Sequence, residues 1–113
     1  EIIATGDTTP LNTLSISDST LQAVKKGMYG YTQPGGMVYS YFKDCIVSAG
    51  AKTGTAQGED GSRPNAMIAG FVLDDEYPLA FFAAVEHGGY GADVCVPLMG
   101  QVLAACKEAL DKT

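Results

Sequence analysis

The run Lys52-Thr53-Gly54-Thr55 carries the residues of this sequence that are best suited to chemistry. It places a cation, two hydroxyl groups and a residue without Cβ next to one another. Besides its nucleophile, a serine acyl transfer needs a proton relay, donors for the developing oxyanion and groups that hold the substrate. Lys52, Thr53 and Thr55 can supply parts of each, and Gly54 would let a substrate approach the backbone closely.

The residues before this motif are typical of a strand. Residues 38–42 and 45–49 are apolar and β-branched, and they lead through Gly50 into the motif without a strong strand breaker. We therefore predict that this stretch forms a strand that carries the motif. At the edge of a sheet, such a strand could pair its free N–H and C=O groups with an extended peptide.

Two apolar runs after the motif predict a β-hairpin. Residues 66–73 and 79–86 are apolar on both faces, which is typical of strands covered on both sides. Together with the motif strand, this hairpin predicts a small antiparallel sheet flanked by helices over 17–28 and 92–110. The expected fold class is therefore α+β. Residues 1–5 are also β-prone and predict a strand end before the first helix.

The predicted helices have cap candidates and apolar stripes. Residues 17–20 offer several N-caps for the first helix, and Ser19 with Gln22 fits the spacing of a capping box. For the last helix, Asp93 or a nearby residue is the expected N-cap, and Pro97 is tolerated in the first turn. Its expected core stripe is Leu98, Val102, Ala105 and Ala109, with Met99, Cys106 and Leu110 beside them.

The composition is that of a globular chain and argues against several classes of protein. With 113 residues and 46% hydrophobic content, the chain can form one ordinary domain with a core. A formal net charge of -6, with only 7 scattered basic residues, argues against a nucleic-acid partner. The longest apolar runs are far shorter than the roughly 20 residues that cross a bilayer. A start at Glu1 without a secretory leader predicts a processed product or a piece of a longer protein.

Neither a metal nor a cofactor is expected. Cys45, Cys95 and Cys106 lack CxxC spacing, which predicts buried free thiols rather than a disulfide framework or a zinc site. His87 lies in a glycine-rich stretch without a partner histidine, which favours a loop or capping role.

Two competing motifs fail at required positions. A Walker A loop needs Gly directly before its Lys and another Gly five residues earlier, where this chain has Ala51 and Ile46. After Gly89-Tyr90-Gly91, Val94 stands where a dinucleotide-binding loop has its third Gly. Lys-Thr-Gly remains the motif to explain.

Several stretches agree in order and spacing with one known family, namely Lys25-Lys26-Gly27-Met28, residues 52–57, 65–71 and 85–91, and the closing helix. From about Ile16 onward, the chain resembles the C-terminal part of the transpeptidase domain of class B high-molecular-mass penicillin-binding proteins, in which Lys-Thr-Gly is a signature motif. The resemblance implies a partial β-lactamase/transpeptidase-like fold, with residues 1–113 as a C-terminal fragment of that domain.

That family also needs a Ser-x-x-Lys motif, which holds the nucleophile, and a Ser-x-Asn motif, both far upstream of Lys-Thr-Gly. Ser40 and Lys43 have the letters of the first, but they lie only a dozen residues before Lys52. Ser17-Asp18-Ser19 lacks the Asn of the second and suits a helix cap better. We therefore expect the catalytic serine to lie outside this chain.

The resemblance implies roles for the motif residues. Lys52 would place positive charge beside the absent serine and support proton movement. The hydroxyls of Thr53 and Thr55 resemble groups that bind the terminal carboxylate of a stem peptide or a β-lactam. The backbone N–H of Thr55 resembles one of the two oxyanion donors, and Gly54 completes the substrate-binding strand.

The parent protein would accordingly be a serine D,D-transpeptidase that cross-links peptidoglycan and is inhibited by β-lactams, and this chain alone would be inactive. Expected partners are the stem peptide, β-lactams and the missing N-terminal part of the domain, whose docking surface would favour self-association of this chain. The parent would be membrane-anchored, with the domain on the extracytoplasmic face of the bacterial membrane. A β-lactamase, a β-lactam sensor and a non-enzymatic binding or assembly module remain alternatives.

Overall fold

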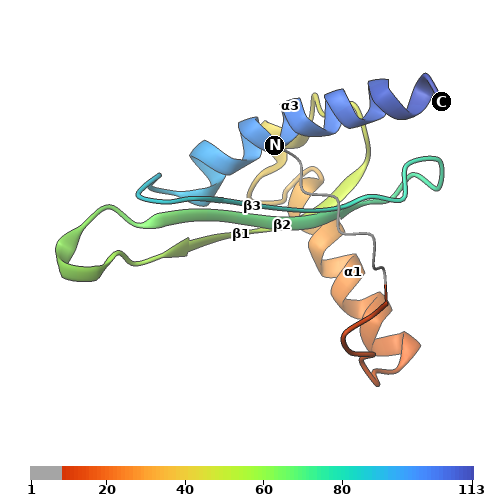
Figure 1. The fold of residues 1–113 in the computed structure, drawn as a ribbon, viewed down its shortest axis with the longest axis horizontal. Helices are drawn as coiled ribbons and strands as arrows, with labels where there is room; N and C mark the ends of the chain where they lie inside the picture. Colours follow the sequence, from red (N-terminus) through yellow and green to blue (C-terminus); the bar gives the residue numbers. More distant parts are fainter. Residues whose placement is uncertain (1–8) are drawn as a thin grey trace.

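A computed structural model describes the chain from Thr9 to Thr113, so the strand end predicted for residues 1–5 lies outside the described part. The described chain combines helices with a small sheet, as the sequence predicts (Figure 1). In chain order, the elements are α1 (Asp18–Thr32), α2 (Tyr39–Phe42), β1 (Ala49–Ala56), the 3-10 turn η1 (Glu59–Gly61), β2 (Asn65–Val72), β3 (Ala80–Val85) and α3 (Gly91–Asp111). The α+β fold class is confirmed.

The strands form one antiparallel sheet in the order β1-β2-β3. Across the first pair, Ala49 faces Val72 and Thr55 faces Ala66. Among the described residues, β1 has no strand on its other side, so the motif lies on an edge strand. The sheet has a hairpin end, where residues 73–79 join β2 to β3, and a motif end, where residues 52–56 complete β1.

The core lies between the sheet and α3, which runs along one face from the motif end to the hairpin end (Figure 1). Small residues line the sheet under the helix, and Ala51 and Ala66 are each 0% exposed. α3 contributes the buried side chains of Cys95, Val96, Met99 and Leu103. Since a buried alanine takes up little space, the helix can approach β1 and β2 closely.

α1 meets the sheet at the free edge of β1 and extends away on the side opposite α3 (Figure 1). Ser17 is its N-cap, and the Ser17 hydroxyl accepts a hydrogen bond from the backbone N–H of Thr20 at 3.2 Å. Capping by Ser17-Asp18-Ser19 is thus confirmed, but the box of Ser19 with Gln22 is wrong. At its C-terminal end, the Thr32 hydroxyl donates to the Ala49 carbonyl at 2.7 Å, which explains why the helix continues beyond residue 28.

The strand predicted over 38–42 is wrong, because this segment forms the short helix α2 and β1 begins only at Ala49. Val38 and Phe42 are both buried, and a spacing of four residues puts them on one side of a helical turn. Alternation along a strand would also put both side chains on one face, so the apolar pattern does not distinguish a strand from a helix here. Packing of α2 against α3 decides it.

Among the elements that the structure describes, α3 packs on one face of β3 and no helix packs on the other, so the prediction of helices on both faces is wrong for this strand. Its residues alternate between exposed and half-buried, and Phe82 is 65% exposed. The face toward α3 carries Phe81, Ala83 and Val85, which pack against the core. Phe82 is thus an exposed apolar side chain on the uncovered face of β3, while the docking surface and self-association stay predictions.

The predicted packing face of the last helix is also wrong, and Asp93 itself is not the N-cap. Leu98, Val102, Ala105, Ala109 and Leu110 are exposed, Cys106 is half-buried, and Met99 is the buried member of that set. The N-cap residue is Tyr90, which makes no side-chain cap, while Asp93 lies in the first turn and accepts a hydrogen bond from the Tyr41 hydroxyl at 2.6 Å. Pro97 lies deeper in the helix than its first turn. The helix is apolar almost all round, so its periodicity could not select the face that packs.

Candidate functional site

The motif residues lie on the exposed half of β1. Ala49, Gly50 and Ala51 are buried, but Lys52 and Thr55 are exposed, and Thr53 and Gly54 are half-buried. Strand alternation places Thr53 and Thr55 on the face that α3 covers, and Lys52 and Gly54 on the other. The Lys52 ammonium donates to the Thr53 carbonyl at 2.7 Å.

Backbone contacts reveal which groups of β1 point away from the sheet. The Ala49 carbonyl accepts from Thr32, and the Thr53 carbonyl accepts from Lys52, so neither is directed at β2. The Ser48 carbonyl, by contrast, pairs with the N–H of Leu73 on the β2 side. In an antiparallel pair, the N–H and C=O of one residue point to the same side and alternate along the strand. The backbone N–H of Thr55 is therefore directed to the free edge.

Thr55 also meets the first turn of α3. Its hydroxyl oxygen accepts a hydrogen bond from the backbone N–H of Gly91 at 3.3 Å. A Cβ at Gly91 would lie 2.4 Å from the Gly54 carbonyl oxygen and 2.5 Å from that of Met67. Only glycine therefore allows the helix to begin this close to the motif. The positive end of the helix dipole lies beside Thr55 as a result.

Tyr31, near the end of α1, is a site residue that the sequence does not reveal. Its hydroxyl lies 2.7 Å from the Thr53 hydroxyl, and the Lys52 ammonium lies 5.0 Å from the centroid of its ring. Gly91 was missed in the same way, apart from its place in the glycine-rich stretch before the last helix. Neither residue belongs to the motif, and each reaches it from another element.

Ser40 and Lys43, which have the spacing of a Ser-x-x-Lys motif, do not lie beside the Lys-Thr-Gly motif. Ser40 is exposed on α2, which packs against α3 and α1. The Lys43 ammonium lies 3.8 Å from the carboxylate of Asp44, in an exposed pair. Hollows of about 360 and 430 Å³ lie beside α2, and neither is lined by a motif residue. The motif itself lies on an open edge.

His87 has the predicted loop role. Its backbone N–H donates to the Asn65 side-chain oxygen at 2.9 Å, and its φ of 53° places it in the left-handed region. Cys45, Cys95 and Cys106 are free, with Cys95 buried and the other two half-buried. Among the side chains that the structure describes, no three of His, Cys, Asp or Glu gather to hold a metal ion. In the same part of the chain, no helix is long and apolar enough to cross a membrane.

Comparisons with known proteins identify the family of this chain. Residues 1–104 match the penicillin binding protein transpeptidase domain. Among solved structures, the chain is similar to penicillin-binding protein PBP2 in its complex with MreC from Helicobacter pylori, with 32% sequence identity and a TM-score of 0.69. The match covers 80% of this chain and 17% of that chain. No curated protein matches the sequence. The chain belongs to the family of penicillin-binding protein transpeptidase domains.

Proposed function

We propose that this chain supplies the Lys-Thr-Gly strand of a class B peptidoglycan D,D-transpeptidase. The observation that carries the proposal is the free edge of β1, which presents the exposed Lys52 together with the outward-directed N–H of Thr55. Residues 1–113 are, on this proposal, a C-terminal part of the transpeptidase domain. The nucleophilic serine lies outside them and faces β1 in the intact protein.

The proposed chemistry divides among the motif residues. A stem peptide or β-lactam lies along β1, and its terminal carboxylate accepts hydrogen bonds from the hydroxyls of Thr53 and Thr55. The serine attacks the carbonyl carbon, and the N–H of Thr55 donates to the oxygen as negative charge develops there. The Lys52 ammonium stabilises that charge and supports removal of the serine proton.

The hydroxyl of Thr55 has a proton available for this role. A hydroxyl can accept hydrogen bonds and donate one at the same time. The Gly91 N–H holds the Thr55 oxygen as an acceptor, which leaves its proton to point toward an incoming carboxylate. This contact supports the assignment of Thr55 to the carboxylate-binding group.

Gly54 has room for a ligand beside it. A Cβ at this position would come no closer than 3.5 Å to the rest of the chain, with Met67 as its neighbour. That is an ordinary contact distance, so packing within the described chain does not require glycine here. We attribute the glycine to the close approach of the substrate or of the element that carries the serine.

The free strand edge also favours a transpeptidase over a β-lactamase. A stem peptide is an extended chain that can add to β1 as a further strand, whereas a β-lactam is too short to use most of that edge. Such pairing would use the Thr53 carbonyl, from which the exposed Lys52 can swing away. Because peptidoglycan lies outside the cytoplasm, the proposed activity belongs on the extracytoplasmic face of a bacterial membrane.

The location of the nucleophile can be tested with a fluorescent penicillin and mass spectrometry. The 113-residue chain and the full-length protein are treated in parallel, and adducts are mapped to single residues. We expect no adduct on the isolated chain and one on a serine outside residues 1–113 of the full-length protein. Stable acylation of Ser40 would overturn the proposal.

A further inference from the structure

Tyr31 joins the last turn of α1 to two residues of the motif. Its hydroxyl is within 2.7 Å of the Thr53 hydroxyl, and its ring faces the Lys52 ammonium, with 5.0 Å from the ammonium nitrogen to the ring centroid. Through one side chain, α1 therefore contacts Thr53, which we propose binds the substrate carboxylate, and Lys52, which is the proposed catalytic cation. The motif's own residues do not account for this contact.

The direction of the hydrogen bond between Tyr31 and Thr53 decides what Thr53 can do. Each hydroxyl has a single proton. If Thr53 donates to Tyr31, its proton is not available to a ligand. If Tyr31 donates to Thr53, the Thr53 proton is free to point at a carboxylate. A phenol is also a better donor than an aliphatic alcohol, so its hydrogen bond polarises the second hydroxyl.

A second acceptor exists for the Tyr31 proton when no ligand is bound. The Tyr31 hydroxyl donates to the sulfur of Met37 at 3.6 Å, a weak hydrogen bond to a thioether. Without a carboxylate, the Thr53 proton can therefore turn toward Tyr31. A bound carboxylate favours the opposite arrangement, because it attracts the Thr53 proton and leaves the Thr53 oxygen to accept from Tyr31.

We propose that Tyr31 is a positioning residue for the substrate carboxylate and for Lys52. In the ligand complex, its hydroxyl donates to Thr53, and Thr53 donates to the carboxylate. Its ring meanwhile holds the Lys52 ammonium alongside β1 through a cation–π contact. No covalent bond changes in this step. The inference rests on the proposed function of the motif strand.

Two substitutions separate the roles of the hydroxyl and the ring. Tyr31→Phe removes the hydroxyl and keeps the ring, whereas Tyr31→Leu removes both. Tyr29→Phe is the matched control, because it removes the same atom from an exposed tyrosine on the same helix. Among the described residues, the Tyr29 hydroxyl makes no hydrogen bond.

The test uses the full-length protein and stopped-flow acylation by a fluorescent penicillin. This measurement yields the dissociation constant of the initial complex and the acylation rate constant separately. We expect Tyr31→Phe to raise the dissociation constant about fivefold and to leave the rate constant within about twofold. Tyr31→Leu should also slow acylation about tenfold, because Lys52 loses its ring. Tyr29→Phe should match the wild type.

A penicillin methyl ester provides a further control, because its carboxylate is masked. For this ester, Tyr31→Phe and wild type should have equal dissociation constants. Equal dissociation constants for the free acid would overturn the inference. So would a joint fall in affinity, rate and unfolding temperature, which would indicate a structural role. If the wild-type protein is not acylated at all, the proposed function itself fails, and this inference falls with it.

Discussion

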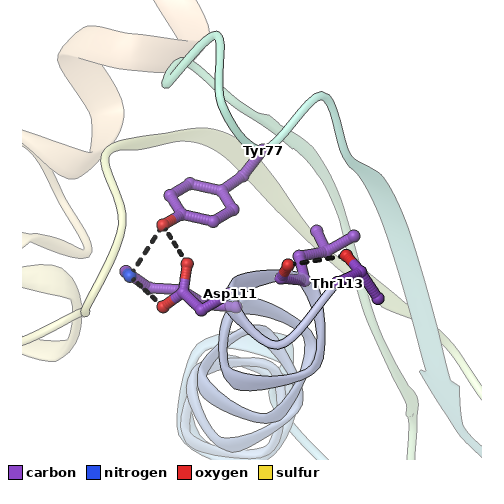
Figure 2. Close-up of polar contacts among 5 residues, drawn as sticks. Tyr77, Asp111 and Thr113 are labelled. Carbon is purple, nitrogen blue, oxygen red and sulfur yellow. Dashed lines mark hydrogen bonds and ion pairs between the residues drawn. The ribbon is translucent and has the colours of Figure 1, made fainter.

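At the hairpin end of the sheet, the last turn of α3 is held by a closed set of polar contacts (Figure 2). The Tyr77 hydroxyl donates to the Asp111 carboxylate at 2.5 Å, and the Lys107 ammonium donates to Tyr77 at 2.8 Å and to Asp111 at 2.7 Å. At the motif end, the N-cap residue Tyr90 makes no side-chain cap. The first turn of α3 is held there by single contacts, from the Gly91 N–H to Thr55 and from the Tyr41 hydroxyl to Asp93, and Lys52 and Thr55 stay exposed. The same helix thus ends in a closed polar network and begins beside exposed motif residues.

The hairpin end therefore contributes to stability, whereas the motif end holds the groups of the proposed chemistry. The polar side chains of the hairpin end satisfy one another, which leaves them little capacity for a ligand. The motif end keeps a cation and a hydroxyl group exposed, and a backbone N–H directed to the free edge. Between the two ends, Ala51 is fully buried and its neighbour Lys52 is exposed, so the change occurs within one step along β1.

The largest structural effect is expected from Gly91→Ala, which would disturb the motif end. The new Cβ would overlap two carbonyl oxygens, at 2.4 and 2.5 Å, and would force α3 away from β1 and β2. We expect the free energy of unfolding to fall by about 2 kcal/mol in a urea titration.

Gly100→Ala is the matched control for this change. It lies in the same helix, and a Cβ there would have no atom within 4 Å. Because alanine favours the helix, stability should rise by about 0.5 kcal/mol. Equal effects of the two substitutions would mean that α3 does not begin against the motif.

A smaller effect on the free energy of unfolding is expected from Asp111→Asn, which removes the charged partner of Lys107 and Tyr77 at the hairpin end. The hydrogen bond from Lys107 is the main cause that lowers the pKa of the Asp111 carboxyl, and the hydrogen bond from Tyr77 lowers it further. Its contribution to stability is therefore fully present above the unfolded pKa, near about 4, and is lost as the pH falls through the folded pKa.

Unfolding midpoints in urea, measured between about pH 5 and pH 2, would detect this contribution. The wild type should lose stability more steeply than Asp111→Asn over that range. Parallel profiles would show that the contacts in Figure 2 do not hold the helix.

The sequence predicts which helices and strands form better than it predicts which of their faces are buried. The sheet, its hairpin and the order of the helices follow from strong apolar runs and from glycine and proline breaks. The buried face of α3 does not follow from the pattern, because Leu98 and Val102 form a stripe as apolar as that of Met99 and Leu103. Only contact with the small residues of β1 and β2 selects between the two stripes.

The site was predictable only as far as the motif extends. Lys52, Thr53 and Thr55 are adjacent in sequence, and strand geometry presents them together. Tyr31 and Gly91 come from 22 and 36 positions away from their partners Thr53 and Thr55. Their contacts depend on where α1 ends and α3 begins, and element ends are the part of a fold that sequence patterns define least well.

Among the motif residues, Lys52 has the most direct role in the proposed chemistry, and a comparison of two lysines tests that role. In the full-length protein, acylation by a fluorescent penicillin is timed for Lys52→Ala and for Lys43→Ala, with unfolding temperature as the fold control. We predict that Lys52→Ala slows acylation by about a thousandfold without unfolding the protein, and that Lys43→Ala changes the rate less than about twofold. Equal acylation rates for Lys52→Ala and wild type would remove Lys52 from the proposed chemistry.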